Sequence, residues 1–488
     1  MKKIFEKIKN APMQVKASFA FLVCSFLGRG AAIITTPLFT RMMTTSEYGS
    51  FGVFNSWVSI ISCFVTLNLS GGIYAQCLVK YSESKEKYKS SFQGLTLCLS
   101  IIFGVIYLIF RNSINSFLGY STDEMIMMLM IIWTSAVYHL WAAGQRVEYR
   151  YRLLSIISIS STVLTALLGI FFVFKLKDKV FGRILGWCIT QVVLFAWLFF
   201  FDIRKGKILF SKEIWKYAIN MAFPLIPHYL STIILNSSDR IMIKEMIDES
   251  SAGIYNLAYS LSLIMTVFNS SLLSTIEPWI YKQIKSGNFK KIEKVAYPSF
   301  LGIALLNILL IAFAPEIIFV FAPKTYYDAK WVVPPVAMSV YFMFLYSFFA
   351  TFEFYYEKTK FITFATVTGA IVNVVTNYIF IKIFGYVAAG YTTLLCYIIF
   401  AIMHYIFMNK IAKENIKQQV YNIKIIFALT IGFMVIGFAL LLSYNVILIR
   451  YGIVLILIIV IICLRKKIID YCKYIMSVRK ENKIEGNK

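Results

Sequence analysis

Charged residues are scarce in this sequence. They make up 15% of the 488 positions, while 59% of the positions are hydrophobic and the mean hydropathy is +0.72. An ordinary soluble domain contains about 25% charged and about 45–50% apolar residues. The apolar residues also gather into runs of about 20, the length that crosses a hydrocarbon core roughly 30 Å thick. The scarcity of charge therefore excludes an ordinary soluble protein and indicates a multi-pass membrane protein.

Motifs of metal, nucleotide and catalytic sites are also missing. The eight cysteines show no C-x-x-C spacing and the three histidines form no spaced cluster, so we predict no metal site. No G-x-x-x-x-G-K-[ST] motif is present, which argues against ATP coupling within this chain. The segments between apolar runs are too short for a soluble catalytic domain. We expect no enzyme activity, no catalytic residue and no cofactor, and we leave coupling to H⁺ or Na⁺ open.

Apolar runs and the charged breaks between them predict an all-α protein with about fourteen transmembrane helices. Twelve spans followed by a C-terminal helix pair describe the pattern almost as well. The expected spans are 18–40, 50–78, 90–110, 126–144, 154–174, 180–201, 214–236, 252–276, 295–314, 331–350, 361–381, 386–408, 423–443 and 445–464.

A net charge of +25 could suggest nucleic acid as a partner, but its distribution indicates membrane topology. Of the 49 Lys and Arg residues, 35 lie in alternate segments between the spans, beginning with the N-terminal segment and ending with the C-terminal one. Basic residues accumulate in cytoplasmic loops. We therefore expect both termini in the cytoplasm, a multi-pass protein of a bacterial inner (plasma) membrane, contact with the lipid bilayer and no nucleic-acid partner.

Weak internal similarity suggests two repeats. Residues 41–60 resemble residues 244–263, and Gly49 matches Gly253 at an offset of 204. Two shorter similarities lie at nearly the same offset. They are "FGRILG" with "FGYVAAG" at 203, and "VEYRY" with "FEFYY" at 205.

The repeats predict two six-helix halves and a C-terminal helix pair. The expected boundaries are 1–205, 206–410 and 411–488, the last with a basic cytoplasmic tail. Because six is an even number, both halves enter the membrane from the same side and the repeats are parallel. In transporters built this way, the substrate site lies between the halves and access to it alternates.

Three stretches in this order carry a family resemblance: "PLFTRMMTTSEYGSFGVF", "FPLIP" followed by "SSDRIMIKEMIDESSAGIYNLAYSLS", and "NVVTNYIFIKIFGYVAAGY". Together they resemble bacterial polysaccharide and O-antigen flippases, which share an exporter superfamily with lipid II flippases and multidrug extruders. The resemblance covers nearly the whole chain. It implies transfer of an undecaprenyl-diphosphate-linked oligosaccharide from the cytoplasmic to the outer leaflet for surface polysaccharide or lipopolysaccharide synthesis. It also suggests the polymerase and glycosyltransferases of the same pathway as partners.

Ionisable side chains inside a span cost several kcal/mol, so each of them needs an explanation. Arg29 lies near the middle of the first span, where it could bond to carbonyl groups or bind a diphosphate. Asp239 and Arg240 follow the hydropathy boundary at 236, but the offset of 204 places them inside the seventh helix, opposite Thr35 and Thr36. They form either an ion pair at a helix interface or a site in which Arg240 faces the substrate and Asp239 orients Arg240 or binds a proton or another cation.

Four asparagines complete the set of candidate substrate-binding residues. Asn373 and Asn377 are four residues apart and share one helix face, which suits either bonds between helices or contacts to sugars. Asn55 and Asn68 in the second span are weaker candidates of the same kind.

Two other functions remain as alternatives. An ion-coupled multidrug extruder would favour an acidic, aromatic cavity, and the candidate arginines argue against it. A membrane glycan polymerase would need a large outer loop, whereas the longest outer loop here is only 315–330.

Overall fold

The computed structural model describes residue 20, residues 23–24, residue 30 and residues 34–485. Regular secondary structure in this part of the chain is entirely helical, and twelve of its helices are long and apolar enough to cross a membrane. The final helix, α20 (Ile447–Glu485), adds the apolar stretch Ile447–Cys463. The predicted all-α polytopic fold is confirmed.

Contacts divide the chain into two compact units. Unit 1 consists of residues 1–244 and 248–253, and unit 2 consists of residues 245–247 and 254–488. The seventh helix, which the repeats place at the start of the second half, thus packs almost entirely with unit 1.

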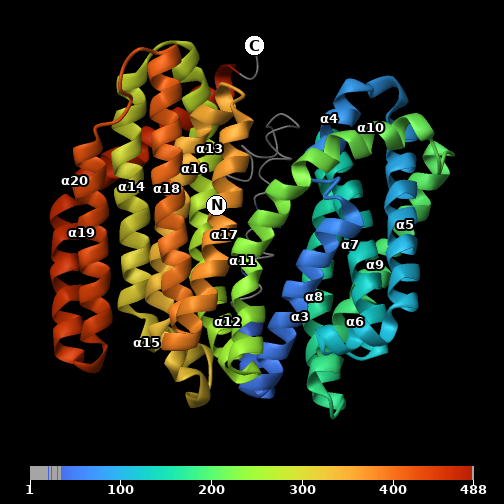
Figure 1. Cartoon of the computed structure of the whole chain (residues 1–488). Helices are drawn as coiled ribbons and strands as arrows, with labels where there is room; N and C mark the ends of the chain where they lie inside the picture. Colours follow the sequence, from blue (N-terminus) through green and yellow to red (C-terminus); the bar gives the residue numbers. More distant parts are fainter. Residues whose placement is uncertain (1–19, 21–22, 25–29, 31–33, 486–488) are drawn as a thin grey trace, which may run out of the picture. The chain divides into compact units, whose positions relative to one another are not determined.

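Unit 1 is a bundle of membrane-length helices joined by short helices (Figure 1). Its elements are α3 (Thr45–Thr66), α4 (Ile73–Lys80), η1 (Ser82–Ser84), α5 (Lys85–Ile109), α6 (Arg111–Leu118), α7 (Thr122–Val147), α8 (Tyr151–Lys175), α9 (Lys179–Gly206), α10 (Lys212–Ala222), η2 (Phe223–Leu225), most of α11 (Ile226–Met246) and the start of α12 (Glu249–Leu263).

Unit 2 is a second bundle, which contains the rest of α12 and the C-terminal helix pair (Figure 1). Its elements are α13 (Met265–Lys285), α14 (Phe289–Ala312), α15 (Ala314–Phe321), η3 (Lys324–Trp331), α16 (Val333–Tyr355), α17 (Thr359–Phe384), α18 (Ala388–Asn415), α19 (Ile423–Leu442), η4 (Ser443–Asn445) and α20.

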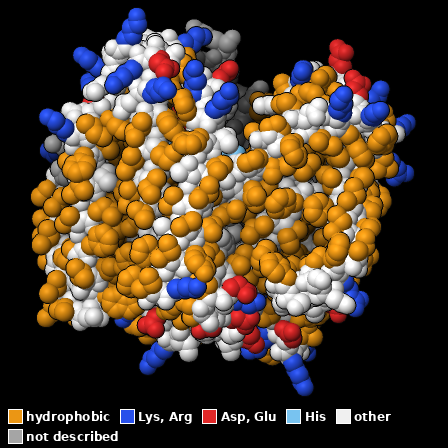
Figure 2. Space-filling view, in the orientation of Figure 1, with side chains coloured by type: hydrophobic (Ala, Val, Ile, Leu, Met, Phe, Trp, Pro, Cys, Tyr) orange, Lys and Arg blue, Asp and Glu red, His pale blue; other side chains and the backbone are white. Residues whose placement is uncertain are grey.

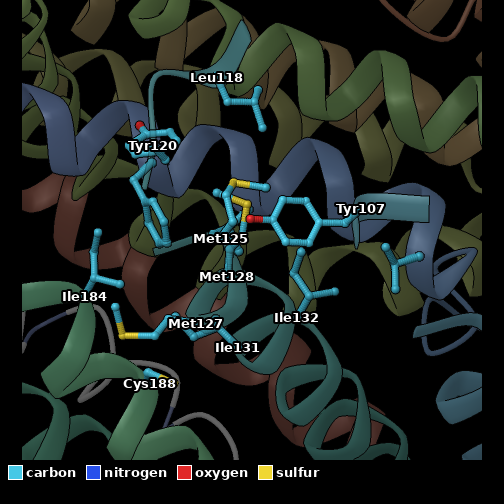
Figure 3. Close-up of a cluster of buried hydrophobic side chains, with 13 residues drawn as sticks. Tyr107, Leu118, Tyr120, Met125, Met127, Met128, Ile131, Ile132, Ile184 and Cys188 are labelled. Carbon is cyan, nitrogen blue, oxygen red and sulfur yellow. The ribbon is translucent and has the colours of Figure 1, made fainter. Parts of the chain in front are cut away.

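Each unit has apolar residues both inside and outside. Inside unit 1, Met128 and Ile131 of α7 belong to one buried cluster with Ile184 of α9 (Figure 3). Phe54 of α3 is a member of the same cluster. On the face that Figure 2 shows, hydrophobic side chains cover the middle of the helices in each unit, and charged side chains gather at the helix ends. Exposed apolar residues over the middle of a helix are expected where the surrounding solvent is lipid.

Helix boundaries test the repeat. α5 begins at Lys85 and α14 at Phe289, an offset of 204, as the first similarity predicts. α8 begins at Tyr151 and α17 at Thr359, an offset of 208. The extra residues enter before α16, where the 3₁₀ helix η3 occupies Lys324–Trp331. The helix starts thus differ by an offset of 204 before η3 and of 208 after it.

That change corrects the two shorter similarities. Gly182 lies in the first turn of α9, whereas Gly385 follows α17 with a φ of 76°, so the two F-G pairs are not equivalent. The left-handed residues that follow α7 and α16 are Tyr149 and Glu357, at an offset of 208. The "VEYRY" match at 205 is thus out of register by three residues.

Gly49 and Gly253, which match in the first similarity, lie at a contact within unit 1. Gly49 is the fifth residue of α3 and Gly253 is the fifth residue of α12, so both occupy the same place in their helices. Ser46 Oγ donates a hydrogen bond to Glu249 Oε2 at 2.8 Å, and Ser250 Oγ donates one to Thr45 Oγ1 at 2.6 Å. Equivalent turns of the two repeats therefore bond to each other.

Candidate functional site

Asp239 and Arg240 lie inside α11, the main part of the seventh span. α11 begins after a break at Pro224 in η2 and continues to Met246, so the hydropathy boundary at 236 was ten residues too early. The described part of the first helix ends at residue 42, which the offset of 204 maps onto Met246. The offset therefore placed both side chains correctly within the seventh helix. Asp239 is 1% exposed and Arg240 is 8% exposed.

Arg240 connects α11 to α3. Its Nη1 donates to the Ser56 hydroxyl oxygen at 3.4 Å and to the Asn236 carbonyl oxygen at 3.0 Å. Ser56 is buried, whereas its neighbour Asn55, a predicted site residue, is exposed. The structure thus brings Arg240 to the level of Asn55 on α3. A buried guanidinium can attract an anion strongly here because little water screens its charge.

Asn68 does not join this group. It follows α3, thirteen positions after Asn55, which is about 20 Å along a helix axis. Leu67 and Asn68 have φ values of 48° and 45°, and the Asn68 carbonyl accepts a bond from the Gly71 amide at 2.9 Å. This left-handed turn between α3 and α4 gives Asn68 a structural role.

Asn373 and Asn377 are fully buried in unit 2. Asn377 Nδ2 donates to Asn373 Oδ1 at 3.4 Å, and the Thr392 hydroxyl of α18 donates to Asn377 Oδ1. Both amides therefore share one face of α17, as their spacing predicts, and this face packs on α18. The geometry matches the interpretation in which the asparagines bond helices together.

Arg29 lies outside the described residues. The structure therefore places six of the seven predicted site residues: three near or on the α3–α11 contact, one in the α3–α4 turn, and two between α17 and α18.

Sequence reasoning missed a buried acid–imidazole pair in unit 2. His404 Nδ1 of α18 lies 2.7 Å from Glu353 Oε1 of α16, and the two residues are 1% and 0% exposed. Tyr346 stacks on the imidazole with ring centroids 5.4 Å apart. The two residues are 51 positions apart, so no local spacing could reveal the pair.

A second missed group lies at one end of unit 1. Lys89 Nζ donates to Glu86 at 2.9 Å and to Glu148 at 2.7 Å, and Gln93 donates to Asp202 at 2.9 Å. In the sequence these positions resemble ordinary charged segments at span ends. Among the described residues, no group of three or more His, Cys, Asp and Glu side chains is arranged to hold a metal ion.

Comparisons with known families identify the chain's relatives. Residues 15–284 match the family model described as "Polysaccharide biosynthesis protein", and residues 224–379 match the MatE model. Two curated proteins of Haemophilus influenzae are similar in sequence. An uncharacterized membrane protein is 20% identical over 73% of this chain and 88% of its own length. The Lsg locus putative protein 1 is 21% identical over 74% and 89%.

Solved structures share the fold. The lipid II flippase MurJ, in its inward closed conformation, superimposes with a TM-score of 0.71 at 16% identity, covering 91% of this chain and 99% of MurJ. An inward-facing multidrug resistance transporter of the MATE family gives a TM-score of 0.60 at 15% identity, covering 80% and 94%. The family match spans more than half of the sequence, and the helices are those of a multi-pass membrane protein. The chain therefore belongs to the polysaccharide biosynthesis protein family and has the fold shared by flippases and multidrug transporters of the MOP superfamily.

Proposed function

We propose that this protein is a flippase for a polyprenyl-diphosphate-linked oligosaccharide. It would move the carrier from the cytoplasmic to the outer leaflet of a bacterial inner membrane by alternating access, with both termini in the cytoplasm. The observation that carries the proposal is the buried Arg240 in a membrane-crossing helix of a chain from the polysaccharide biosynthesis family.

Arg240 suits a diphosphate for chemical reasons. A guanidinium is planar, keeps its charge and binds phosphate oxygens through parallel hydrogen bonds. The bonds to Ser56 on α3 and to Asn236 on α11 hold its side chain in one orientation. We propose that Arg29 supplies a second cation and that Asn55, exposed beside Ser56, contacts the polar headgroup.

The membrane potential favours this direction of transport. Outward movement of an anion across an inside-negative membrane gains about 2.3 kcal/mol per charge per 100 mV. Coupling to H⁺ or Na⁺ would add to this force, and Asp239, buried beside Arg240, is a candidate for such a role. The polymerase and glycosyltransferases of the same pathway are the proposed protein partners.

A multidrug extruder is the second candidate, since residues 224–379 match the MatE model. The fold favours the flippase, because the TM-score to MurJ is 0.71 and that to the MATE transporter is 0.60. An acidic cavity would bind cationic drugs, whereas a buried arginine repels them. Arg240 therefore also argues against a drug extruder.

The test is complementation of a deletion strain, with the lipid-linked oligosaccharide in each leaflet quantified. The double variant R29A/R240A should reach the membrane in normal amounts and accumulate the carrier in the inner leaflet. The exposed Arg111 offers a matched control, since R111A removes a cation at a helix end. Undiminished surface glycan in R29A/R240A would refute the role of the two arginines.

A further inference from the structure

Within the described residues, one buried carboxyl group of unit 1 has no cation paired with it. Asp202 lies in the last turns of α9 and is 2% exposed. Gln93 Nε2 of α5 donates to its Oδ2 at 2.9 Å and also to the Val137 carbonyl of α7 at 3.3 Å. In the part of the chain that the structure describes, no salt bridge reaches Asp202. Its carboxyl group therefore faces a neutral amide.

Among the described residues, the charged side chains around Asp202 form ion pairs with one another and not with Asp202. Lys89 bonds to Glu86 and Glu148 instead of Asp202, and Arg150 pairs with Glu148 at 3.1 Å. The titratable and charged groups that interact with Asp202 are Tyr74 from α4, Glu86 and Lys89 from α5, and Lys205 on α9 itself. Glu148 at the end of α7 and Arg150 before α8 belong to the ion pairs around Lys89.

Unsatisfied polar atoms accompany the carboxyl. Gln93 Oε1 and the Tyr74 hydroxyl lack hydrogen-bond partners within the described residues, although both residues are 0% exposed. Buried polar atoms are nearly always bonded, and an unbonded one costs about 1–3 kcal/mol. Two such atoms beside one carboxyl indicate a missing ligand with hydrogen to share.

A proton meets this requirement. A carboxylate at the C-terminal end of a helix is repelled by the helix dipole, and burial adds a desolvation cost. A neutral carboxyl group loses both penalties and gains an O–H. The neutral form of Asp202 thus adds one hydrogen-bond donor to a group in which two oxygen atoms, Gln93 Oε1 and the Tyr74 hydroxyl oxygen, lack partners within the described residues.

We propose that Asp202 is a proton-binding site that fills from the side of unit 1 predicted to be cytoplasmic. The carboxylate takes one H⁺ from water and becomes a neutral carboxyl, with no other bond made or broken. The paired ionisable groups at this end of unit 1 differ in exposure: the exposed fraction of the side chain falls from 57% for Arg150 to 9% for Glu148 and 7% for Lys89.

Proton binding would act on a tightly packed contact between α5 and the end of α9. A β-carbon on Gly206 would lie 2.2 Å from the Glu86 carbonyl oxygen, and one on Gly94 would lie 2.0 Å from the Leu209 carbonyl oxygen. The backbone of α5 therefore touches the end of α9 at Gly206 and the segment after α9 at Leu209. Proton uptake changes the charge inside this contact and couples the packing of α5 and α9 to pH.

Infrared titration of the purified full-length protein in lipid nanodiscs tests the site. The wild type should show the C=O band of a protonated, buried carboxyl that grows as the pH falls. D202N should lack this band, and D178N, which removes an exposed carboxyl at the other end of α9, should keep it. Identical titrations of the wild type and D202N would overturn the proposal. Proton binding is measurable whether or not the protein flips a glycan, so this result is independent of the transport assay.

Q93L provides a second measurement if D202N folds poorly. Removing the amide donor to the charged form should tighten proton binding by about tenfold or more, because a hydrogen bond to a charged group is worth about 1.5–3 kcal/mol. The midpoint of the band should therefore move to higher pH. An unchanged midpoint in Q93L would contradict the assignment to Asp202.

Discussion

Gly49 and Gly253 leave no room for a side chain between them. A β-carbon on Gly49 would lie 2.0 Å from the Glu249 carbonyl oxygen, and one on Gly253 would lie 2.0 Å from the Thr45 carbonyl oxygen. The two glycines occupy the same position in α3 and α12, one in each repeat. The glycine of each repeat therefore leaves room for the backbone of the other repeat.

Replacing either glycine by alanine should destabilise the protein. The new methyl group would meet backbone atoms, which cannot rotate away, and overpacking of this kind costs about 1–3 kcal/mol. The measurement is the free energy of unfolding of G49A and G253A in detergent. G104A, on α5 with open space around it, is the control, and it should be neutral or stabilising. Equal stabilities for G49A and G104A would contradict the close contact.

Changing Arg240 to lysine should separate binding from folding. R240K keeps the charge but loses the planar fork, so a single lost bidentate contact should slow flipping about tenfold or more. Its melting temperature should stay close to that of the wild type. S56A removes one acceptor of Arg240 and should have a smaller effect on flipping, since the bond to the Asn236 carbonyl remains. Normal flipping by an unstable R240K would show that Arg240 serves only structure.

The side-chain amides of Asn373 and Asn377 in unit 2 should contribute to the stability of the protein and not to transport. N377A removes two buried hydrogen bonds, one to Asn373 and one from Thr392, at a cost of about 0.5–1.5 kcal/mol for each bond. In the double variant N377A/T392V the loss should be smaller than the sum of the single losses, because the two side chains share one bond. Asn112, exposed on α6, gives the control N112A. Full stability of N377A with lost transport would instead favour a sugar contact.

Acid should destabilise the Glu148 cluster. Burial alone would raise the pKa of the Glu148 carboxyl, but the bonds and charges of Lys89, Lys85 and Arg150 lower it below the ordinary 4.5. A carboxyl whose pKa is lowered by folding stabilises the protein above its unfolded pKa and loses that stabilisation as the pH falls through the folded value. The stability of the wild type should therefore decline below about pH 4.5.

The variant E148Q checks this origin. At neutral pH it should lose about 1.5–3 kcal/mol, the worth of a hydrogen bond to a charged group, and its stability should depend less on pH in the acid range. The measurement is the melting temperature across an acid series for both proteins. E124Q, in the first turn of α7 and far along that helix from Glu148, is the control. Parallel acid curves for the wild type and E148Q would exclude Glu148 as the source.

Composition and hydropathy were enough to predict the class of the protein and most of its helices. Runs of about 20 apolar residues must lie in lipid, and a backbone in lipid must satisfy its own hydrogen bonds, so the spans follow from the chain's local character. The offset of 204 even corrected hydropathy at Asp239 and Arg240, because an equivalent helix has an equivalent length. The offset failed beyond η3, where a few residues enter one repeat only.

Which polar residues meet could be learned only from the packed helices. Arg240 and Ser56 are 184 positions apart, Gln93 and Asp202 are 109 apart, and Glu353 and His404 are 51 apart. No local period links such pairs, since their distance depends on how helices pack and rotate. Asn55 and Asn68 show the converse: both lie in one predicted span, yet a left-handed turn at Leu67 and Asn68 breaks that span and gives them separate roles. Helix formation is a local property of the chain, whereas the sites arise from contacts that packing alone creates.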